Sequence, residues 1–287
     1  MTRVLVLDFD GTMTDAEREG EPFIRGYLDD LATLTGAREQ APRARLDAIA
    51  AMIDAAMLAA PAEHGYPWNG RLVAPASVDP YLRMVPVANA ILDEFKAFEH
   101  AVDRARLHQI LFRYNYDKTR AHPCFKSGAR ELLASLAGTE TFVVTNSDTE
   151  AVRGKIETLD DGTGALAWLF DRVHGYAQKF EVDDTWADGP AELRIPELQR
   201  AVLTRRRRYH DRIQGLLDGA GASWKDLTVV GDIFELDLSM PLAKGARVGL
   251  VANARTPSYE RKFVESLHPQ GKLIDDLREI PAFAFAP

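Results

Sequence analysis

Asp8 and Asp10 are the residues near the start of the chain whose types and spacing could do chemistry together. They follow the apolar run VLVL at residues 4–7, which is typical of a strand covered on both faces of a parallel sheet. Side chains two apart in a strand point to the same side, so both carboxylates should lie at the strand's carboxyl end. One carboxylate can attack phosphorus and form an aspartyl phosphate while the other moves a proton. Two carboxylates this close also need a cation between them.

The stretch DFDGT at residues 8–12 resembles the D-x-D-G-T signature of the haloacid dehalogenase (HAD) superfamily. This resemblance implies that Asp8 is the nucleophile and that Asp10 is the general acid and base. Gly11 lets the backbone turn sharply off the strand, and the Thr12 hydroxyl can hold the carboxylates and the substrate phosphate. The implied fold is α/β, a three-layer, Rossmann-like parallel sheet that forms the HAD core, with an inserted α-helical cap.

A second β-rich run, TFVV at residues 141–144, leads into Thr145, Asn146 and Ser147 and resembles the second motif of the same superfamily. Glu150 stands three residues after Ser147, a spacing typical of a capping box, which predicts that a helix begins directly after the strand. A strand end followed by a helix N-terminus offers a hydroxyl and free backbone N–H groups to an anion. We therefore expect Thr145 and Asn146 to bind the substrate phosphate.

Lys179 follows a short apolar stretch that ends at Gly175, and we interpret it as the third motif. A phosphoaspartate site needs a cation beside the nucleophile and the transferring phosphoryl group, and lysine supplies a compact positive charge that can also bind the phosphate. Phe180 stands where the commoner form of this motif has proline. Lys155 and the arginines near residue 205 therefore remain alternatives for this cation.

Four consecutive arginines, at residues 205–208, fall in a segment that we expect to be one helix. The apolar stripe of that helix would consist of Leu198, Val202, Tyr209, Ile213 and Leu216. Four consecutive residues sweep around the circumference of a helix, so they cannot all face one ligand. We expect most of these arginines to be solvated, while one of them could hold phosphate bidentately.

A third buried-type run, LTVV at residues 227–230, ends in Gly231 and Asp232. Together with Asp237, it resembles the G-D-x-x-x-x-D form of the fourth HAD motif. Three buried strands that each end in polar residues, in the order expected for this superfamily, indicate one shared site. Glu235 is a further carboxylate in the same stretch, and no role follows for it from the sequence.

Mg²⁺ is the cofactor that the resemblance implies. This ion prefers oxygen ligands and usually takes only one or two carboxylates from the protein. Asp8, the backbone carbonyl of Asp10 and Asp232 would bind Mg²⁺ directly. Asp237 would bind a metal-bound water or orient Lys179.

Two kinds of periodicity divide the rest of the chain. Residues 16–121 show helical spacing, with the first helix expected after Pro22, whereas strand and helix patterns alternate from residue 122 onward. Such alternation implies a parallel sheet with right-handed crossovers. We therefore expect a core domain of residues 1–15 and 122–287 and a helical cap domain of residues 16–121.

The segment from Pro61 to Pro80 interrupts the helical pattern with four prolines and two glycines, and we expect it to be an irregular loop. A helical cap should close over the core, and this is its least regular part. We therefore expect the string from Tyr66 to Arg71 to contribute to substrate choice, with Trp68 and Arg71 as the side chains to test.

Composition narrows the classes of partner. The chain has 287 residues, 46% of them hydrophobic, which is ample for a real core, and a formal net charge of −8. Nucleic acids and membrane surfaces would repel this charge, so we expect a small diffusible substrate, which the family resemblance implies is a phosphorylated metabolite. Cys124 is the only cysteine, so the chain can form no internal disulfide. The N-terminal apolar run is short and stops at Asp8, and we expect a cytoplasmic protein without a membrane span.

The function implied is Mg²⁺-dependent hydrolysis of a small phosphate monoester through an aspartyl-phosphate intermediate. A sugar phosphomutase would use the same Asp8 and Asp10 but would return the phosphoryl group to a sugar. A dehalogenase would need the nucleophile but not Asp10 as an acid. A HAD-fold binding protein without turnover is a further alternative, against which the carboxylates of Asp8, Asp10 and Asp232 argue. The identity of the substrate and the oligomeric state stay open.

Overall fold

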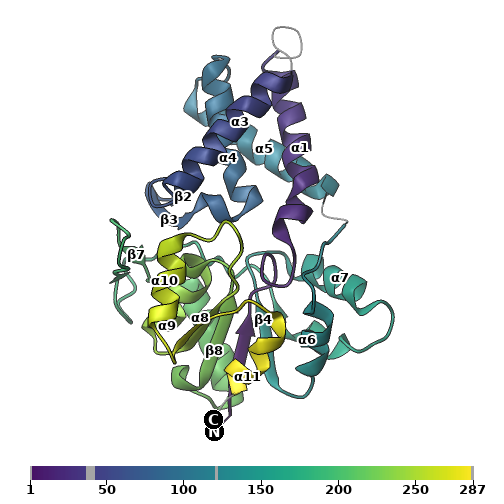
Figure 1. Ribbon diagram of the computed structural model, residues 1–287, viewed down its shortest axis with the longest axis vertical. Coiled ribbons are helices and arrows are strands. Elements are labelled where there is room, and N and C mark those ends of the chain that lie inside the picture. The colour runs from purple at the N-terminus through teal and green to yellow at the C-terminus, as the bar shows by residue number, and fades with distance from the viewer. Residues whose placement is uncertain (1, 37–42, 120–121, 286–287) are drawn as a thin grey trace. The chain divides into compact units, whose positions relative to one another are not determined.

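The computed structural model describes residues 2–36, 43–119 and 122–285 of the chain, and it folds as two compact units (Figure 1). The sheet unit comprises Met1–Asp15, Pro67–Ala74 and Phe125–Pro287, and the helical unit comprises Ala16–Tyr66 and Pro75–Cys124. Residues 67–74 therefore group with the sheet, although in sequence they lie between helices of the other unit. Residues 120–121, at the expected end of the cap, lie outside the described residues.

A six-stranded parallel sheet with the strand order β10-β9-β8-β1-β4-β5 forms the sheet unit. All four residues of β1 are buried, and Leu7 at its end lies level with Val143 and Val230 of the two neighbouring strands. The carboxyl ends of β1, β4 and β8 therefore meet at one edge of the sheet. The strands are β1 (Val4–Leu7), β4 (Glu140–Val144), β5 (Val173–His174), β8 (Leu227–Gly231), β9 (Arg247–Leu250) and β10 (Gly271–Leu273).

Helices connect these strands. Right-handed crossovers place α6 and α7 on one face of the sheet and α8, α9 and α10 on the other (Figure 1). Apolar side chains of β1, β4, α6 and α7 share one buried cluster, in which Leu7, Val143 and Ile156 are fully covered. These observations confirm the predicted α/β fold. The helices are α6 (Ala129–Ser135), α7 (Thr149–Asp160), α8 (Arg207–Ala220), α9 (Ser239–Ala243), α10 (Ser258–Ser266) and α11 (Ile280–Phe285).

The helical unit contains α1 (Ala16–Leu34), α3 (Arg43–Ala59), α4 (Pro80–Glu94) and α5 (Ala101–Thr119), which confirms the predicted helical insertion after the first strand. These helices share a buried apolar cluster that includes Phe23, Leu31 and Ile91. The expectation that the first helix begins after Pro22 is wrong. The helix begins at Ala16 and contains Pro22, and the carboxylates in its first turn suit the positive end of the helix dipole.

The segment from Pro61 to Pro80 is not an irregular loop. It contains a two-stranded ribbon of β2 (Gly65–Trp68) and β3 (Arg71–Pro75). Asn69 and Gly70 join the strands and have φ values of +48° and +75°, as the two central residues of a tight hairpin turn require. An Asn-Gly pair between strands is a strong hairpin signal, and the high proline content of the segment masks it.

The segment before α8 also differs from the expectation. Glu192–Leu193 (β6) and Val202–Leu203 (β7) pair as antiparallel strands, and α8 begins only at Arg207. The backbone around Val202 and Leu203 pairs across to Glu192 and Leu193, and Thr204 N–H donates to the carbonyl of Ala191, so these groups are used in strand pairing instead of helical hydrogen bonds. The four consecutive arginines therefore straddle the start of the helix rather than lying within it.

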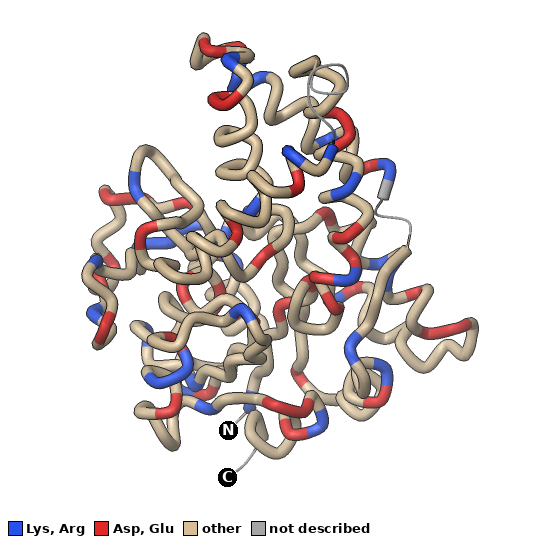
Figure 2. The backbone as a smooth tube through the Cα atoms, turned by 45° about the horizontal axis from the view of Figure 1, so that its top comes forward, with Lys and Arg blue, Asp and Glu red and all other residues tan. Residues whose placement is uncertain are grey.

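Basic and acidic residues are interspersed along the backbone of each unit (Figure 2). Within the described residues, neither unit carries a long run of one sign, apart from the four arginines at residues 205–208. Over the same ranges, the structure has no helix with the combined length and apolar character that a membrane crossing requires.

Candidate active site

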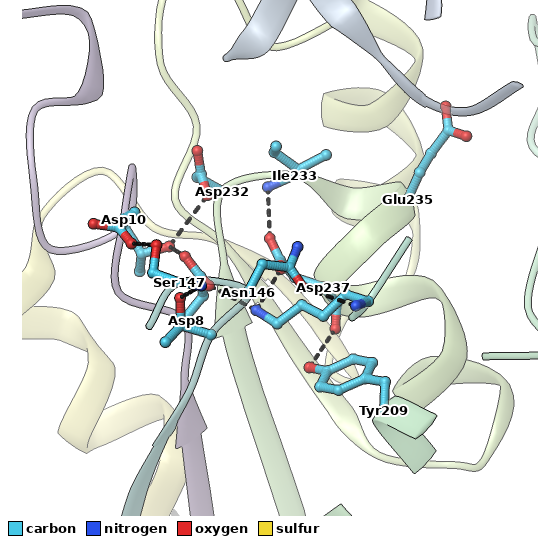
Figure 3. Close-up of polar contacts among 12 residues, drawn as sticks. Asp8, Asp10, Asn146, Ser147, Tyr209, Asp232, Ile233, Glu235 and Asp237 are labelled. Atoms are coloured by element: carbon cyan, nitrogen blue, oxygen red, sulfur yellow. Dashed lines mark hydrogen bonds and ion pairs between the residues drawn. The ribbon is translucent and has the colours of Figure 1, made fainter. Parts of the chain in front are cut away.

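Asp8 is the centre of the site at the carboxyl edge of the sheet (Figure 3). Its backbone N–H donates to the carbonyl of Val230 over 2.8 Å, which continues the pairing of β1 with β8 beyond the last strand residue. Asp8 is 7% exposed. Its Oδ1 accepts from Lys179 Nζ at 2.6 Å, and its Oδ2 accepts from Thr12 Oγ1 at 3.1 Å. Thr12 also contacts Asp232 Oδ1 at 3.3 Å, so one hydroxyl links the two predicted metal ligands.

Lys179, five residues after the end of β5, is 1% exposed and lies between two carboxylates. Its Nζ donates to Asp8 over 2.6 Å and to Asp237 over 2.8 Å. Burial alone would lower the pKa of Lys179, but the charges of Asp237 and Asp8 outweigh it and hold the pKa above its ordinary value. The ammonium is therefore a permanent positive charge beside the predicted nucleophile.

At the Asp8 carboxyl, in contrast to Lys179, the effect of burial on the pKa outweighs the effect of the nearby opposite charge. Burial raises its pKa to about 7, and the attraction of Lys179 offsets only part of this effect. The repulsion from Asp237 and Asp10 adds to the rise. A second cation close to Asp8 would favour its ionised form.

Asp8, Asp232 and Asp237 bring their carboxylate oxygens within 4.8 Å of one another, and all three are buried. Asp237 already accepts from Lys179 and, through Oδ2, from the backbone N–H of Ile233 at 3.0 Å. Lys179 contacts Asp8 and Asp237, and the charge of Lys126 acts on Asp232 and Asp8. The three buried carboxylates together offer the oxygen ligands that fit a divalent cation held by Asp8 and Asp232. Asp237 is better placed to orient Lys179.

Two glycines allow this approach of carboxylates. Gly11 has a φ of +82°, and a Cβ atom on it would lie 2.2 Å from Asp232 Oδ2. On Gly231, a Cβ atom would lie 2.5 Å from the Cβ of Asp237. Any side chain at either position would displace one of the carboxylates. Residues 234–238, which follow Asp232, form a π-helical turn. A π-helical turn holds more residues than an α-helical turn, and this one includes Asp237.

Asp10 lies beside Ser147 in Figure 3. Its Oδ2 accepts from Ser147 Oγ at 2.5 Å, and its Oδ1 accepts from Lys155 Nζ at 2.6 Å. The expectation that Ser147 caps the next helix is wrong. Asp148 is the N-cap of α7 and accepts from Ala151 N at 2.9 Å, which leaves the Ser147 hydroxyl to Asp10. Lys155, an alternative for the third-motif cation, contacts Asp10.

Thr145 and Asn146 follow β4, as expected. Thr145 is 2% exposed, and its Oγ1 accepts from the backbone N–H of Ser147 at 3.1 Å. Among the described residues, no acceptor takes the hydroxyl hydrogen of Thr145. Asn146 Oδ1 accepts from the backbone N–H of Lys179 at 2.7 Å, so the side-chain oxygen of Asn146 holds the lysine in place.

Glu235 points away from Asp8 in Figure 3. It is completely buried and forms a bidentate pair with Arg200, with both N–O distances at 2.7 Å. Among the four consecutive arginines, only Arg207 and Arg208 are exposed and Arg205 is partly buried, so the expectation that most of them are solvated is met for two of the four. Arg206 is completely buried and donates to the backbone carbonyl of Lys179.

Several contacts of the site lie outside the sequence-based expectations. Among them are the bond from Ser147 to Asp10, the bond from Lys126 Nζ to the carbonyl of Gly11, and the bond from Tyr209 Oη to the carbonyl of Asp237. Two of these acceptors are backbone carbonyls, for which a sequence gives no signal. Lys155 does carry a signal, because it shares the helical spacing of the buried residues Val152 and Ile156.

The fold of this chain, unlike its sequence, is similar to those of known proteins. No protein-family model matches the sequence, and no curated protein sequence matches it. Solved structures that share its architecture include the following three, each below 25% sequence identity. The HAD-hydrolase YfnB from Bacillus subtilis, bound to magnesium, is 16% identical over 99% of this chain and 99% of its own, with a TM-score of 0.54.

The second solved structure is a predicted phosphoglycolate phosphatase from Haemophilus somnus, which is 13% identical over 98% of this chain and 96% of its own, with a TM-score of 0.54. The third, from Bacteroides fragilis and assigned to the haloacid dehalogenase-like hydrolases, is 13% identical over 98% of this chain and 100% of its own, with a TM-score of 0.50. The resemblance of the sequence motifs to the HAD superfamily thus extends to the fold. The chain has the haloacid dehalogenase-like fold, a parallel α/β core with helices inserted after its first strand.

Proposed function

We propose that this protein is a Mg²⁺-dependent hydrolase of small phosphate monoesters that works through an aspartyl phosphate on Asp8. One observation carries the proposal above all others. Asp8 lies buried between Lys179 at 2.6 Å and the Thr12 hydroxyl that also contacts Asp232. A nucleophilic carboxylate, a fixed cation and a second carboxylate for a metal are thus gathered at one strand end.

In the first step, an oxygen of Asp8 attacks the phosphorus atom, and the bond from phosphorus to the leaving oxygen breaks. Asp10 gives a proton to that oxygen, so the product leaves as an alcohol. In the second step, Asp10 takes a proton from water, whose oxygen attacks the same phosphorus atom. The bond to Asp8 then breaks, inorganic phosphate leaves, and both carboxylates return to their initial states.

Lys179 has the role of a fixed countercharge. Its ammonium lies against the nucleophile throughout, and Asp237 holds it on the other side at 2.8 Å. It lowers the cost of bringing an anionic phosphoryl group to an anionic carboxylate. Thr145, with a hydroxyl hydrogen that no described residue accepts, is the proposed donor to the phosphoryl oxygens, together with the Thr12 hydroxyl.

Asp8, Asp232 and the backbone carbonyl of Asp10 would hold Mg²⁺. When bound, the ion would neutralise negative charge and polarise a phosphoryl oxygen. A protein with the same fold supports this choice of metal, because YfnB is bound to magnesium in its own structure. The description of another as a predicted phosphoglycolate phosphatase supports a phosphate monoester as substrate.

The helical segment of residues 16–121 is the proposed cap, with residues 1–15 and 122–287 as the core. Its side chains would select the substrate, a small phosphorylated metabolite in the cytoplasm. The formal net charge of −8 supports a diffusible substrate over nucleic acid or a membrane surface. Trp68 and Arg71 remain the proposed side chains for substrate choice.

The experiment that tests this proposal is a screen of phosphate monoesters with Mg²⁺ and with a chelator, using sugar bisphosphates as additional activators. Wild-type protein should release phosphate only when Mg²⁺ is present. Asp8→Asn should be inactive, whereas Glu21→Gln, a substitution on the exposed side of α1, should be as active as wild type. Transfer of phosphate between sugar positions without release would indicate a phosphomutase instead. Phosphate release by the Asp8→Asn variant at the wild-type rate would exclude the proposed nucleophile.

A further inference from the structure

Two residues at the start of α8 hold the backbone around the predicted site. Arg206 directly precedes the helix and is completely buried. Its Nη1 donates to the carbonyl of Lys179, and its Nη2 donates to the carbonyl of Val73 at 2.9 Å. Tyr209, three residues further on, donates its hydroxyl to the carbonyl of Asp237 at 3.0 Å. The Tyr209 ring lies 5.4 Å from Lys179 Nζ, within the range of a cation–π contact.

Lys179 is consequently fixed at every polar group. Its backbone N–H donates to Asn146 at 2.7 Å, its carbonyl accepts from Arg206, and its ammonium contacts Asp8 and Asp237. A buried side chain held in this way cannot change its rotamer without breaking several bonds. The position of the ammonium is therefore set largely by the backbone contacts at residue 179.

Using Arg206 to hold two carbonyls has an energetic cost. Among the described residues, no carboxylate lies within ion-pair distance of its guanidinium, although burying a charge without a direct partner is unfavourable. Burial lowers its pKa to about 10, so the group still carries its charge at neutral pH. A planar guanidinium can direct two N–H groups at two separate carbonyls, a geometry that a lysine ammonium cannot reproduce.

We propose that Arg206 and Tyr209 are positioning residues that hold Lys179 and Asp237 in register with Asp8, and that Arg206 joins this arrangement to the ribbon of residues 67–74. The effect that this proposal predicts on kcat rests on the proposed function. Neither residue touches the reacting atoms. Arg206 acts through the carbonyl of Lys179, and Tyr209 acts through the carbonyl of Asp237.

The ribbon is a fixed partner in this arrangement. In addition to the bond that Val73 accepts, Arg71 of the ribbon donates two hydrogen bonds to Asp184, at 3.2 and 2.7 Å. Its Trp68 packs edge-on against Phe180, with ring centres 5.3 Å apart. These contacts therefore involve Phe180 and Asp184, which follow Lys179 in the chain. A short ribbon that is inserted in sequence among cap helices thus forms part of the framework of the core site.

Arg206→Lys and Tyr209→Phe test the proposal, with Arg205→Lys as the matched control. Arg205 is the preceding arginine and donates to the carbonyl of Asp184 at 2.9 Å, but it does not contact Lys179. The first readout is hydrogen exchange of the Lys179 amide, and the second is the division of any kinetic loss between kcat and KM. Both substitutions keep most of the side-chain volume, and Tyr209→Phe removes only one hydroxyl.

Arg206→Lys should speed exchange of the Lys179 amide at least tenfold relative to Arg205→Lys. It should also lower kcat at least tenfold while KM stays within about threefold, because the ammonium would no longer be held where charge develops. Tyr209→Phe should lower kcat in the same way by a smaller factor. If Arg206→Lys fails to fold, the kcat of Tyr209→Phe tests the proposal instead.

Exchange and kcat equal to those of Arg205→Lys in both variants would overturn the proposal. A loss of thermal stability without a change in kcat would do the same, because it would assign Arg206 and Tyr209 to folding alone. If the wild-type protein hydrolyses no phosphate monoester, the proposed function fails, but exchange of the Lys179 amide still tests whether Arg206 holds that residue.

Discussion

The sheet unit and the helical unit bury different kinds of side chain. In the sheet unit, charged groups are buried near the carboxyl edge of β1 and β8; they include Asp8, Lys179, Arg206, Asp232, Glu235 and Asp237. In the helical unit, the buried cluster is apolar and aromatic, with Phe23 at its centre against Tyr27, Tyr81 and Phe112. Ion pairs such as Arg25 with Glu21 lie in solvent there.

The helical unit also buries charged side chains, Glu19 and Arg83 among them. Arg83 pairs with Glu17 at 2.7 Å. Elsewhere in that unit, basic and acidic residues lie along the helices (Figure 2) and contribute little to stability, because exposed pairs are screened by water. The two units therefore differ in what they bury: the sheet unit buries charged groups at one edge of its sheet, whereas the helical unit buries mainly apolar side chains.

After Asp8→Asn, which should be inactive, Asp10→Asn should have the largest effect on rate. If Asp10 is the acid and base, an amide at this position cannot transfer the proton, and hydrolysis of an alkyl phosphate should slow by about 10² to 10⁴. This loss corresponds to roughly 2.7 to 5.4 kcal/mol in the activation barrier. Steady-state kinetics on an alkyl and an aryl phosphate would measure it. The loss should be smaller for the aryl phosphate, whose leaving oxygen needs less protonation.

Glu21→Gln in the helical unit is the control, because Glu21 is exposed and pairs only with Arg25 among the contacts described for it. Its rate should equal that of the wild type. An Asp10→Asn variant that hydrolyses the alkyl phosphate at the wild-type rate would remove Asp10 from the mechanism and would weaken the contrast between the two units.

Lys179→Met should have the largest effect on stability. Methionine fills a similar volume but leaves Asp8 and Asp237 buried beside one another without their shared cation. Removing one partner of a buried ion pair typically costs about 3–5 kcal/mol in the free energy of unfolding. Arg25→Met in the helical unit removes an exposed partner and should change the same quantity by less than about 0.5 kcal/mol.

Urea denaturation at neutral pH, in the presence of a chelator, compares these two variants directly. Equal losses of stability would contradict the assignment of buried, mutually dependent charges to the sheet unit. A loss for Lys179→Met that disappears at low pH would sharpen it, because protonation of the two carboxylates would then have relieved their repulsion.

Asp8→Asn should have a smaller effect on stability, and one that depends on pH. The pKa of the unfolded carboxyl lies near its ordinary value of 3.8, whereas the folded one has a pKa of about 7. Between these values the folded state binds more protons, so the stability of the metal-free wild type should fall as the pH rises from about 4 to 7. The amide does not ionise, so the variant should be more stable than the wild type at pH 8, by on the order of 1 kcal/mol or more.

Denaturation curves at pH 5 and pH 8 in a chelator would reveal this difference. The advantage of Asp8→Asn over the wild type should be larger at pH 8. Addition of Mg²⁺ should then stabilise the wild type at pH 8 but not the variant. The same advantage at both pH values would mean that the environment of Asp8 does not disfavour its ionised form.

The parts of the site that follow strand ends can be predicted from the sequence. Asp8 and Asp232 each come directly after a buried apolar run, and the register of β1 against β8 places these ends side by side. The charge that a phosphoaspartate requires predicts Lys179, and the structure places its ammonium against Asp8. The parallel sheet follows from the alternation of strand and helix patterns, and it is confirmed.

Contacts that depend on the backbone cannot be predicted in the same way. The bond from Arg206 to the carbonyl of Lys179 joins residues 27 positions apart and has no pattern in the sequence. The spacing of Ser147 and Glu150 predicts a capping box, but Asp148 is an equally good cap and takes that position, which leaves the serine hydroxyl to Asp10. Where two neighbouring residues can each satisfy a local role, tertiary contacts decide between them.

The ribbon of residues 67–74 shows a further limit. Its Asn-Gly turn is present in the sequence, but the surrounding prolines suggest a loop, and the apolar residues of β3 are too few to form a clear alternating pattern. Its contacts with residues 180–184 lie far away in sequence. Short strands that are stabilised by distant partners carry little local signal.

The identity of the phosphorylated residue is the most direct test of the role assigned to Asp8. Wild-type protein would be mixed with Mg²⁺ and a reactive phosphate monoester, quenched, and treated with borohydride, which reduces an acyl phosphate to an alcohol. Peptide mass spectrometry would then locate the reduced residue. If Asp8 is the nucleophile, homoserine should appear at position 8, and it should be absent from Asp8→Asn and from samples without substrate. Turnover by the wild type with the label at another residue, or with no trapped residue at all, would contradict the aspartyl-phosphate mechanism.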